Sequence, residues 1–257
     1  MEPTEPPPIR TDSQSKIDLQ AQKEIEVASN VLHVLFPEKK FIPFSTEGTS
    51  CVVFQEEATS RLYKVGVNKM ELHLAQDPRV LSGHLKIPDS EELIPYFTRE
   101  ATSAALLADK DAAPEFYGFI SPDVSPDEEA KIKEAFGITD EQFTAYRQLH
   151  TPLPIIIMER VNPRQTPKDF NQALNVIDDE VLISEINRLS QILEELHLFP
   201  GDTEIVWDIE HQRLIFLDTG AMTQEPFMNP SGGFLTAKEH ILRLLPPEIQ
   251  ERVKNQT

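Results

Sequence analysis

The spacing of hydrophobic residues changes along the chain, and the changes predict where helices give way to strands. Residues 16–36 keep the apolar spacing of a helix. Beyond them, short runs rich in β-branched and aromatic residues are separated by polar turns, which is typical of strands. The predicted strands cover residues 40–44, 51–56, 61–65, 116–120 and 154–161. The first three follow one another closely and predict an antiparallel meander.

Helical spacing returns between the later strands and dominates the second half of the chain. The predicted helices cover residues 90–108, a pair within 125–148, 179–197 and 236–253. Ser125 and Glu128 form a capping-box sequence at the start of the pair, and Gly137 separates its two helices. Residues 68–90 show only weak helical periodicity, and a hairpin is expected at residues 205–217. This order predicts an α+β fold rather than alternating β-α-β units.

Composition and charge narrow the class of protein. The chain has 257 residues, 39% of them hydrophobic, which suffices for one large domain or two packed lobes. The single Cys51 excludes an internal disulfide and suits a reducing compartment such as the cytoplasm. No apolar run approaches the roughly 20 residues of a membrane span. Residues 1–18 are rich in proline and are expected to be disordered.

The net charge of −19 bears on the choice of partners. A strongly acidic surface repels the phosphate backbone of nucleic acids and the heads of anionic lipids. Nucleic acid and membrane are therefore poor partners, whereas a basic protein partner is favoured. Solubility alone is an equally good reason for such a charge.

Two features of the meander have the chemistry to bind phosphate. The turn between its first two strands contains Gly48, Thr49 and Ser50. Backbone N–H groups of such a turn can reach phosphate oxygens because glycine has no Cβ to obstruct the approach. Lys64 is a lone cation within the apolar third strand, and a buried ammonium needs an anionic partner.

Two carboxylates complete this set. Glu100 shares one face of its predicted helix with apolar residues such as Phe97, so it also needs a partner, and Lys64 is expected to be that partner. Asp218 stands at the end of an apolar hairpin strand and is followed by Thr219 and Gly220. A carboxylate in this place can hold a hard cation such as Mg²⁺.

The order of these features resembles the eukaryotic-like protein kinase superfamily and, more narrowly, the compact divergent kinases and pseudokinases among bacterial secreted effectors. The resemblance covers about residues 40–220. It implies a bilobal protein-kinase-like fold, with a β-rich N-lobe that carries helical insertions over residues 19–161. A reduced helical C-lobe would cover residues 162–257. It also implies export into a host cell by a non-Sec system.

The resemblance assigns ATP and Mg²⁺ as cofactors and gives each candidate residue a role. The glycine turn would cover ATP, and Lys64 would hold its α- and β-phosphates. Glu100 would orient Lys64, and Asp218 would bind Mg²⁺.

Residues 155–161 resemble the strand that runs into the hinge between the lobes of a kinase. Met158 would then be the gatekeeper, and the backbone from Glu159 to Val161 would bind adenine. Residues 113–118 resemble the entry to the fourth strand of the family.

The catalytic loop departs from the family pattern of His-Arg-Asp, four residues and Asn. Counting back from the hairpin, the asparagine position falls on Glu204, and the histidine position falls on His197. The catalytic aspartate position falls on Phe199, which cannot accept a proton. Asp202 is the nearby carboxylate that could orient the nucleophile instead, and Glu204 could ligate Mg²⁺ together with Asp218.

Three functions remain open from the sequence. The leading hypothesis is an ATP- and Mg²⁺-dependent phosphotransferase that acts on a protein. The second is a pseudokinase that serves as a binding module without phosphoryl transfer. The third is a kinase-fold enzyme that transfers a nucleotidyl group or an amino acid, in which ATP binds in a changed orientation.

Overall fold

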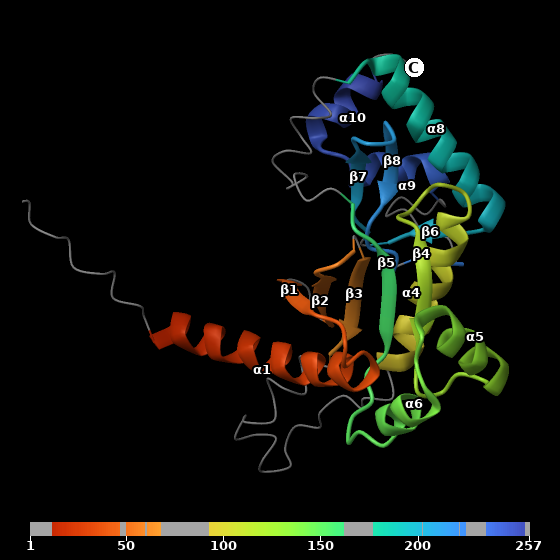
Figure 1. Cartoon of the computed structure of the whole chain (residues 1–257). Coiled ribbons are helices and arrows are strands. Elements are labelled where there is room, and N and C mark those ends of the chain that lie inside the picture. The colour runs from red at the N-terminus through yellow and green to blue at the C-terminus, as the bar shows by residue number, and fades with distance from the viewer. Residues whose placement is uncertain are drawn as a thin grey trace, which may run out of the picture.

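The computed structural model describes residues 12–46, 50–59, 61–67, 93–161, 177–201, 203–220, 222–224 and 235–254, with side chains from residue 21 onward. The expectations for residues 68–90, for Gly48 and Thr49 and for Asp202 lie outside the described residues. Figure 1 shows two halves, one built around a five-stranded sheet and one in which helices surround a short hairpin. The expected two-lobed α+β fold is confirmed.

The predicted meander is part of a larger antiparallel sheet. Its strands are β1 (Phe41–Ser45), β2 (Cys51–Glu56), β3 (Arg61–Gly66), β4 (Phe116–Ile120) and β5 (Ile155–Glu159). They lie in the order β1-β2-β3-β5-β4, and every neighbouring pair is antiparallel. The three consecutive isoleucines of β5 are buried, as expected for a strand covered on both faces.

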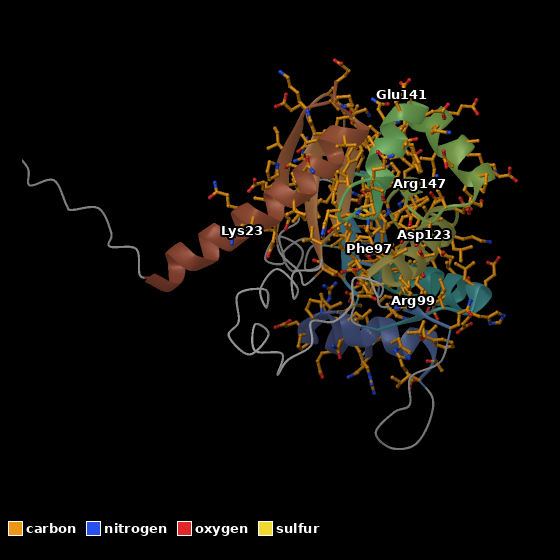
Figure 2. The ribbon with its side chains drawn as sticks, turned by 90° about the horizontal axis from the view of Figure 1, so that it is seen from below. Lys23, Phe97, Arg99, Asp123, Glu141 and Arg147 are labelled. Atoms are coloured by element: carbon orange, nitrogen blue, oxygen red, sulfur yellow. The ribbon has the colours of Figure 1, made fainter. Side chains whose placement is uncertain are left out.

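Helices cover both faces of this sheet, and the side chains of β5 alternate between them. Ile155 and Ile157 pack toward α1 (Asp12–Leu35) and α6 (Asp140–Arg147). Ile156 and Met158 pack toward α4 (Leu93–Ala108). In Figure 2, Phe97 of α4 lies among the crowded side chains of the interior, whereas Lys23 of α1 lies at the edge.

The start of α1 differs from expectation. The helix begins at Asp12, so residues 12–18, which were expected to be disordered, are helical. The last proline of the N-terminal segment is Pro8, and beyond it no residue interrupts the helical backbone. The segment predicted to be disordered from its proline content was therefore too long at its C-terminal end.

The helical pair after β4 has the predicted caps. Helix α5 (Pro126–Phe136) begins at the capping box of Ser125 and Glu128. It ends at Gly137, whose φ of 67° lies in the left-handed region.

Gly137→Ala is expected to lower the free energy of unfolding by about 1 kcal/mol, because alanine is strained at this φ. No atom lies within 4 Å of the position of the new Cβ, so the loss arises from the backbone alone. Urea unfolding followed by circular dichroism measures it. The exposed substitution Glu134→Ala on the same helix serves as a control that should change little; equal stabilities of the two variants would contradict the prediction.

The second half of the molecule has its own hydrophobic core. Its elements are α8 (Asp179–Leu196), β7 (Ile205–Asp208), β8 (Arg213–Phe216), α9 (Ala237–Leu244) and α10 (Pro247–Lys254). The core contains buried residues of the helices and the hairpin, among them Leu182, Ile186, Leu189, Leu193, Val206, Ile215 and Ile241. The loop after α4 is anchored in it, since Phe216 N–H donates to the Ala112 carbonyl at 2.9 Å.

The C-terminal helical stretch is interrupted, contrary to the prediction of one helix over residues 236–253. Leu245 has an extended backbone, with φ −82° and ψ 155°, and divides α9 from α10. The cause is Pro246, because a proline disfavours the helical conformation of the residue before it.

Two very short strands belong to the second half of the molecule and lie near the expected catalytic loop. β6 (Phe199–Pro200) pairs antiparallel with β9 (Met222–Thr223), and Phe199 faces Thr223. Neither strand was predicted, because two residues are too few to form a periodic pattern.

Candidate functional site

The site is organised around Lys64, whose side chain projects from β3 toward α4. Its neighbours Tyr63 and Val65 face the opposite side of the sheet and are fully buried. The Lys64 ammonium contacts one carboxylate oxygen of Glu100, and its Nζ lies 3.6 Å from Oδ1 of Asp218. The expected ion pair between Lys64 and Glu100 is therefore present, and a third residue joins it.

Glu100 lies on the inward face of α4 and is completely buried, together with Phe97 and Leu107 of the same face. One carboxylate oxygen contacts Lys64, and the other has no hydrogen-bond partner within the described part of the chain. Burial raises the pKa of Glu100, and Lys64 opposes this effect. Lys64 is thus what permits a charge in this position.

The charge of Lys64 is secured by two carboxylates. Burial disfavours the ammonium, but the charges of Glu100 and Asp218 outweigh it and raise the pKa of Lys64. The pKa values of Lys64 and Glu100 are both raised, and the two shifts do not conflict. Two carboxylates favour the protonated ammonium of Lys64, whereas burial and repulsion from Asp218 favour the protonated form of Glu100. At neutral pH the ammonium stays protonated.

Asp218 lies in a turn that follows β8 and is bound to α4. Its Oδ1 accepts a hydrogen bond from Gly220 N–H at 3.1 Å, and Thr219 Oγ1 donates to the carbonyl of Glu100 at 3.1 Å. The backbone carbonyl of Glu100 therefore accepts a hydrogen bond from this turn, and its side chain contacts Lys64. The Asp218 side chain is 46% exposed, so a ligand can reach it.

Glu204 is brought beside this turn by a backbone hydrogen bond. Its carbonyl accepts from Leu217 N–H at 2.9 Å, directly before Asp218, and Glu204 is exposed. No three His, Cys, Asp or Glu side chains among the described residues are arranged to hold a metal. Mg²⁺ often takes only one or two carboxylates from the protein and the rest from phosphates and water, so Asp218 and Glu204 suffice in number.

The described end of the glycine turn is tied to β3. The carbonyl of Ser50 accepts a hydrogen bond from Val67 N–H at 2.8 Å. This contact fixes the position of Ser50 beside the end of β3.

The expected hinge residues contact both halves of the molecule. Met158 packs on the α4 side of the sheet, and Val161 packs against the core of the helical lobe. The N–H of Glu159 donates to the Glu115 carbonyl at 2.8 Å, so it is not free to bind a base. The carbonyl of Glu159 and the backbone of Val161 remain the candidate contacts. Arg160, which lies between them in the sequence, donates to Gln55 at 2.8 Å.

The residues around the expected catalytic loop have structural roles that the sequence did not reveal. Phe199 is held in the β6–β9 pair, and its ring lies edge-on to His240, with centroids 6.2 Å apart. His197 ends α8 in the left-handed region, with a φ of 51°. Phe199 is thus a packing residue within a short strand.

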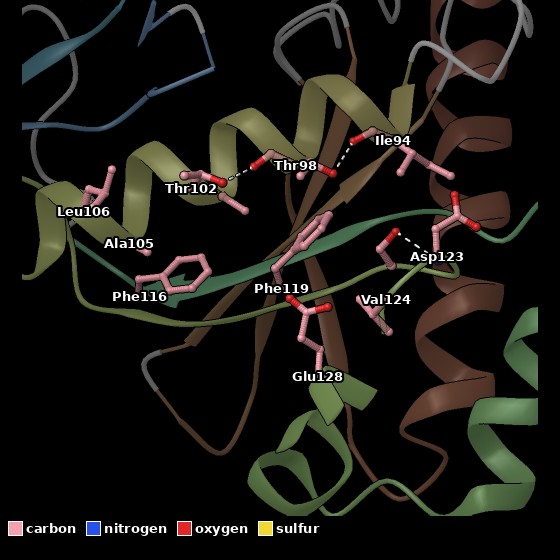
Figure 3. A pocket seen from close by; sticks show the side chains of 12 residues that line it. Ile94, Thr98, Thr102, Ala105, Leu106, Phe116, Phe119, Asp123, Val124 and Glu128 are labelled. Carbon is pink, nitrogen blue, oxygen red and sulfur yellow. Dashed lines mark hydrogen bonds between the residues drawn. The ribbon is translucent and has the colours of Figure 1, made fainter. Parts of the chain in front are cut away.

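Two hollows flank the outward face of α4. One, of about 450 Å³, is lined by α4, β4 and the start of α5, including Phe116, Phe119 and Glu128 (Figure 3). The other, of about 500 Å³, lies beside Gly220 and β9. The hydroxyls of Thr98 and Thr102 in this face donate to carbonyls one turn earlier in the helix, both at 2.8 Å.

Within the described residues, no helix is long and apolar enough to cross a membrane.

Comparison with known proteins gives distant structural likenesses. No protein-family model matches the sequence, and no curated protein is similar to it. The chain is similar to the bifunctional kinase-methyltransferase WbdD, with 16% identity over 74% of this chain and a TM-score of 0.37. It is also similar to vaccinia related kinase 3, with 13% identity over 78% of this chain and a TM-score of 0.36. It spans 34% and 52% of those two chains.

Proposed function

We propose that the protein binds ATP with Mg²⁺ between its lobes and transfers the γ-phosphoryl group to a protein substrate. The observation that carries the proposal is the single ammonium of Lys64, shared by Glu100 and Asp218. A strand, a helix and a turn, far apart in the sequence, supply these three groups. Burying the Lys64–Glu100 pair is unfavourable for stability alone, which favours a role in binding anions.

Each side chain has a task in such a reaction. Lys64 would hold phosphate oxygens, and Glu100 would keep its ammonium charged and directed. Asp218 and Glu204 would hold the metal, which when bound neutralises charge on the phosphates. Asp202 would orient the nucleophile. Phosphoryl transfer depends mostly on such positioning and charge neutralisation.

The remaining contacts of the nucleotide follow the same proposal. Gly48, Thr49 and Ser50 would cover the phosphates, and the backbone of Val161 would meet the base beside Met158. The Lys64 side chain is 13% exposed, so a phosphate can approach it while Glu100 stays buried.

A second function is favoured by Phe199. This aromatic residue occupies the position that the family pattern gives to the catalytic aspartate, and it is fixed in a strand pair. A pseudokinase that binds a nucleotide or a partner protein without phosphoryl transfer would retain Lys64 and Glu100 and would need no carboxylate there.

Labelled ATP separates these functions. The protein is incubated with ATP labelled at the α- or the γ-phosphate, with and without Mg²⁺, in the presence of a host-cell lysate. Transfer of the γ label that is lost in Asp218→Ala supports the phosphotransferase. Transfer of the α label supports nucleotidyl transfer instead. A thermal shift with ATP but no transfer supports the pseudokinase, and the absence of any shift would contradict nucleotide binding.

A further inference from the structure

Tyr96 of α4 comes one turn before Glu100 and lies against the turn that carries Asp218. A Cβ added to Gly220 would lie 2.1 Å from the Tyr96 hydroxyl oxygen and 2.7 Å from the ring carbon that bears it. Real Cβ atoms do not approach other atoms so closely. An alanine at position 220 would therefore require the Tyr96 side chain or the turn to move.

The backbone does not explain this glycine. Among the described glycines only Gly137 has a positive φ, so the conformation of Gly220 is open to alanine. The restriction at position 220 is steric, and Tyr96 imposes it. Tyr96 and the turn at Gly220 thus pack closely against each other, although more than one hundred positions separate them in the sequence.

Three parts of the proposed site meet at the Tyr96 hydroxyl. The side chain of Ser50, at the end of the glycine turn, is near enough to the Tyr96 hydroxyl to lower its pKa. The carboxylates of Glu100 and Asp218 are close enough, together with burial, to raise the pKa of Tyr96. The unpaired oxygen of Glu100 lies 3.2 Å from the same added Cβ.

Packing alone does not require the hydroxyl. The Tyr96 ring joins the cluster between α4 and the sheet, and its centroid lies 5.7 Å from that of Phe97. Phenylalanine would preserve these ring contacts. What tyrosine adds is a polar atom at the point where the glycine turn, α4 and the Asp218 turn come together.

We propose that Tyr96 is a positioning residue, which sets the metal-binding carboxylate of Asp218 in register with Lys64 and with the Ser50 end of the glycine turn. The inference rests on the proposed function, because it assigns a task to the contact between Tyr96 and Gly220. Tyr96 touches neither phosphate nor metal in this role and acts through Gly220 and Ser50.

A double-mutant cycle tests the contact without any nucleotide. Gly220→Ala is expected to lower the melting temperature of the full chain, because the new methyl group meets the Tyr96 hydroxyl and ring. In a Tyr96→Ala background the ring is gone, and the same substitution should lower the melting temperature far less. An equal loss in both backgrounds would overturn the proposal.

Tyr96→Phe tests the task of the hydroxyl. The Mg²⁺ concentration that half-saturates the ATP-induced thermal shift is expected to rise by about fivefold, the effect of one lost hydrogen bond. Tyr117→Phe is the matched control, since it removes an exposed hydroxyl that donates to the carboxylate of Glu115, directly before β4. A mere packing role would leave the Mg²⁺ dependence of Tyr96→Phe equal to that of the control.

Lys64→Met separates this inference from the proposed function. If the wild-type protein shows an ATP-induced shift that Lys64→Met abolishes, while Tyr96→Phe keeps the wild-type Mg²⁺ dependence, only the role of Tyr96 is overturned. If the wild-type protein shows no shift, or if Lys64→Met leaves it intact, the proposed function fails and the inference fails with it.

Discussion

Replacing Lys64 with methionine is expected to abolish ATP binding and to lower the free energy of unfolding by about 3 kcal/mol. The loss of binding follows from removing the only cation that faces both Glu100 and Asp218 among the described ion pairs. The loss of stability follows because Glu100 is completely buried and would keep a charge without a partner. Isothermal calorimetry with ATP measures the first effect, and urea unfolding measures the second.

A second substitution separates the two effects. In the double variant Lys64→Met with Glu100→Gln, position 100 no longer carries a buried charge, so much of the stability should return while ATP binding stays absent. Lys110→Met is the matched control, since Lys110 pairs with Glu195 at the surface, and such pairs contribute less than about 1 kcal/mol. Wild-type stability of Lys64→Met at neutral pH would contradict the buried-charge explanation.

The stability loss of Lys64→Met should also depend on pH. Burial already raises the pKa of Glu100 in the folded protein, and loss of the ammonium removes the charge that opposes this rise. A carboxyl group whose pKa is raised by folding favours the folded state below its unfolded pKa, and this contribution is lost as the pH rises through the folded pKa. The deficit of Lys64→Met should therefore shrink as the solution is acidified.

Replacing Asp218 with asparagine is expected to reduce phosphoryl transfer by at least about 10²-fold while ATP binding persists. Asparagine keeps the oxygen that accepts from Gly220 N–H, so the turn should hold its shape. It removes the negative charge that a divalent cation needs, and it frees Lys64 from its second carboxylate. Initial rates with γ-labelled ATP, measured at several Mg²⁺ concentrations, test this result.

Two companion variants sharpen the Asp218 experiment. Glu204→Gln should weaken the Mg²⁺ dependence less than Asp218→Asn, because Glu204 is placed by its backbone and its exposed side chain lies outside the Lys64 triad. Asp202→Asn should lower the rate with no change in ATP affinity. If Asp218→Asn transfers phosphate at the wild-type rate, the metal role of this turn is refuted.

The central ion pair of the site could be predicted from the sequence, because ionisable groups are rarely buried without a partner. Lys64 and Glu100 are ionisable groups on apolar faces of a strand and a helix, and such groups need partners. The pairing follows from periodicity and charge alone. The α+β order and the caps of α5 follow in the same way from local patterns.

Other features depend on how distant elements meet, which no local pattern encodes. The fit of Tyr96 to Gly220 requires the orientation of α4 on the Asp218 turn. The β6–β9 pair has too few residues to show a period, so Phe199 could be aligned with a catalytic position without any sign of its packing role. The division of the C-terminal helix could have been predicted, because Pro246 marks it.

The link between Thr219 and the backbone of Glu100 bears on how the protein could be controlled. This hydrogen bond and the Lys64 contact hold α4 against both the Asp218 turn and the sheet. The apparent affinity for a ligand falls in proportion to the fraction of molecules that are competent to bind it. If the proposed function holds, an activator that only draws α4 toward the sheet should therefore add little, and control is expected to act on the Asp218 turn or on access to Lys64.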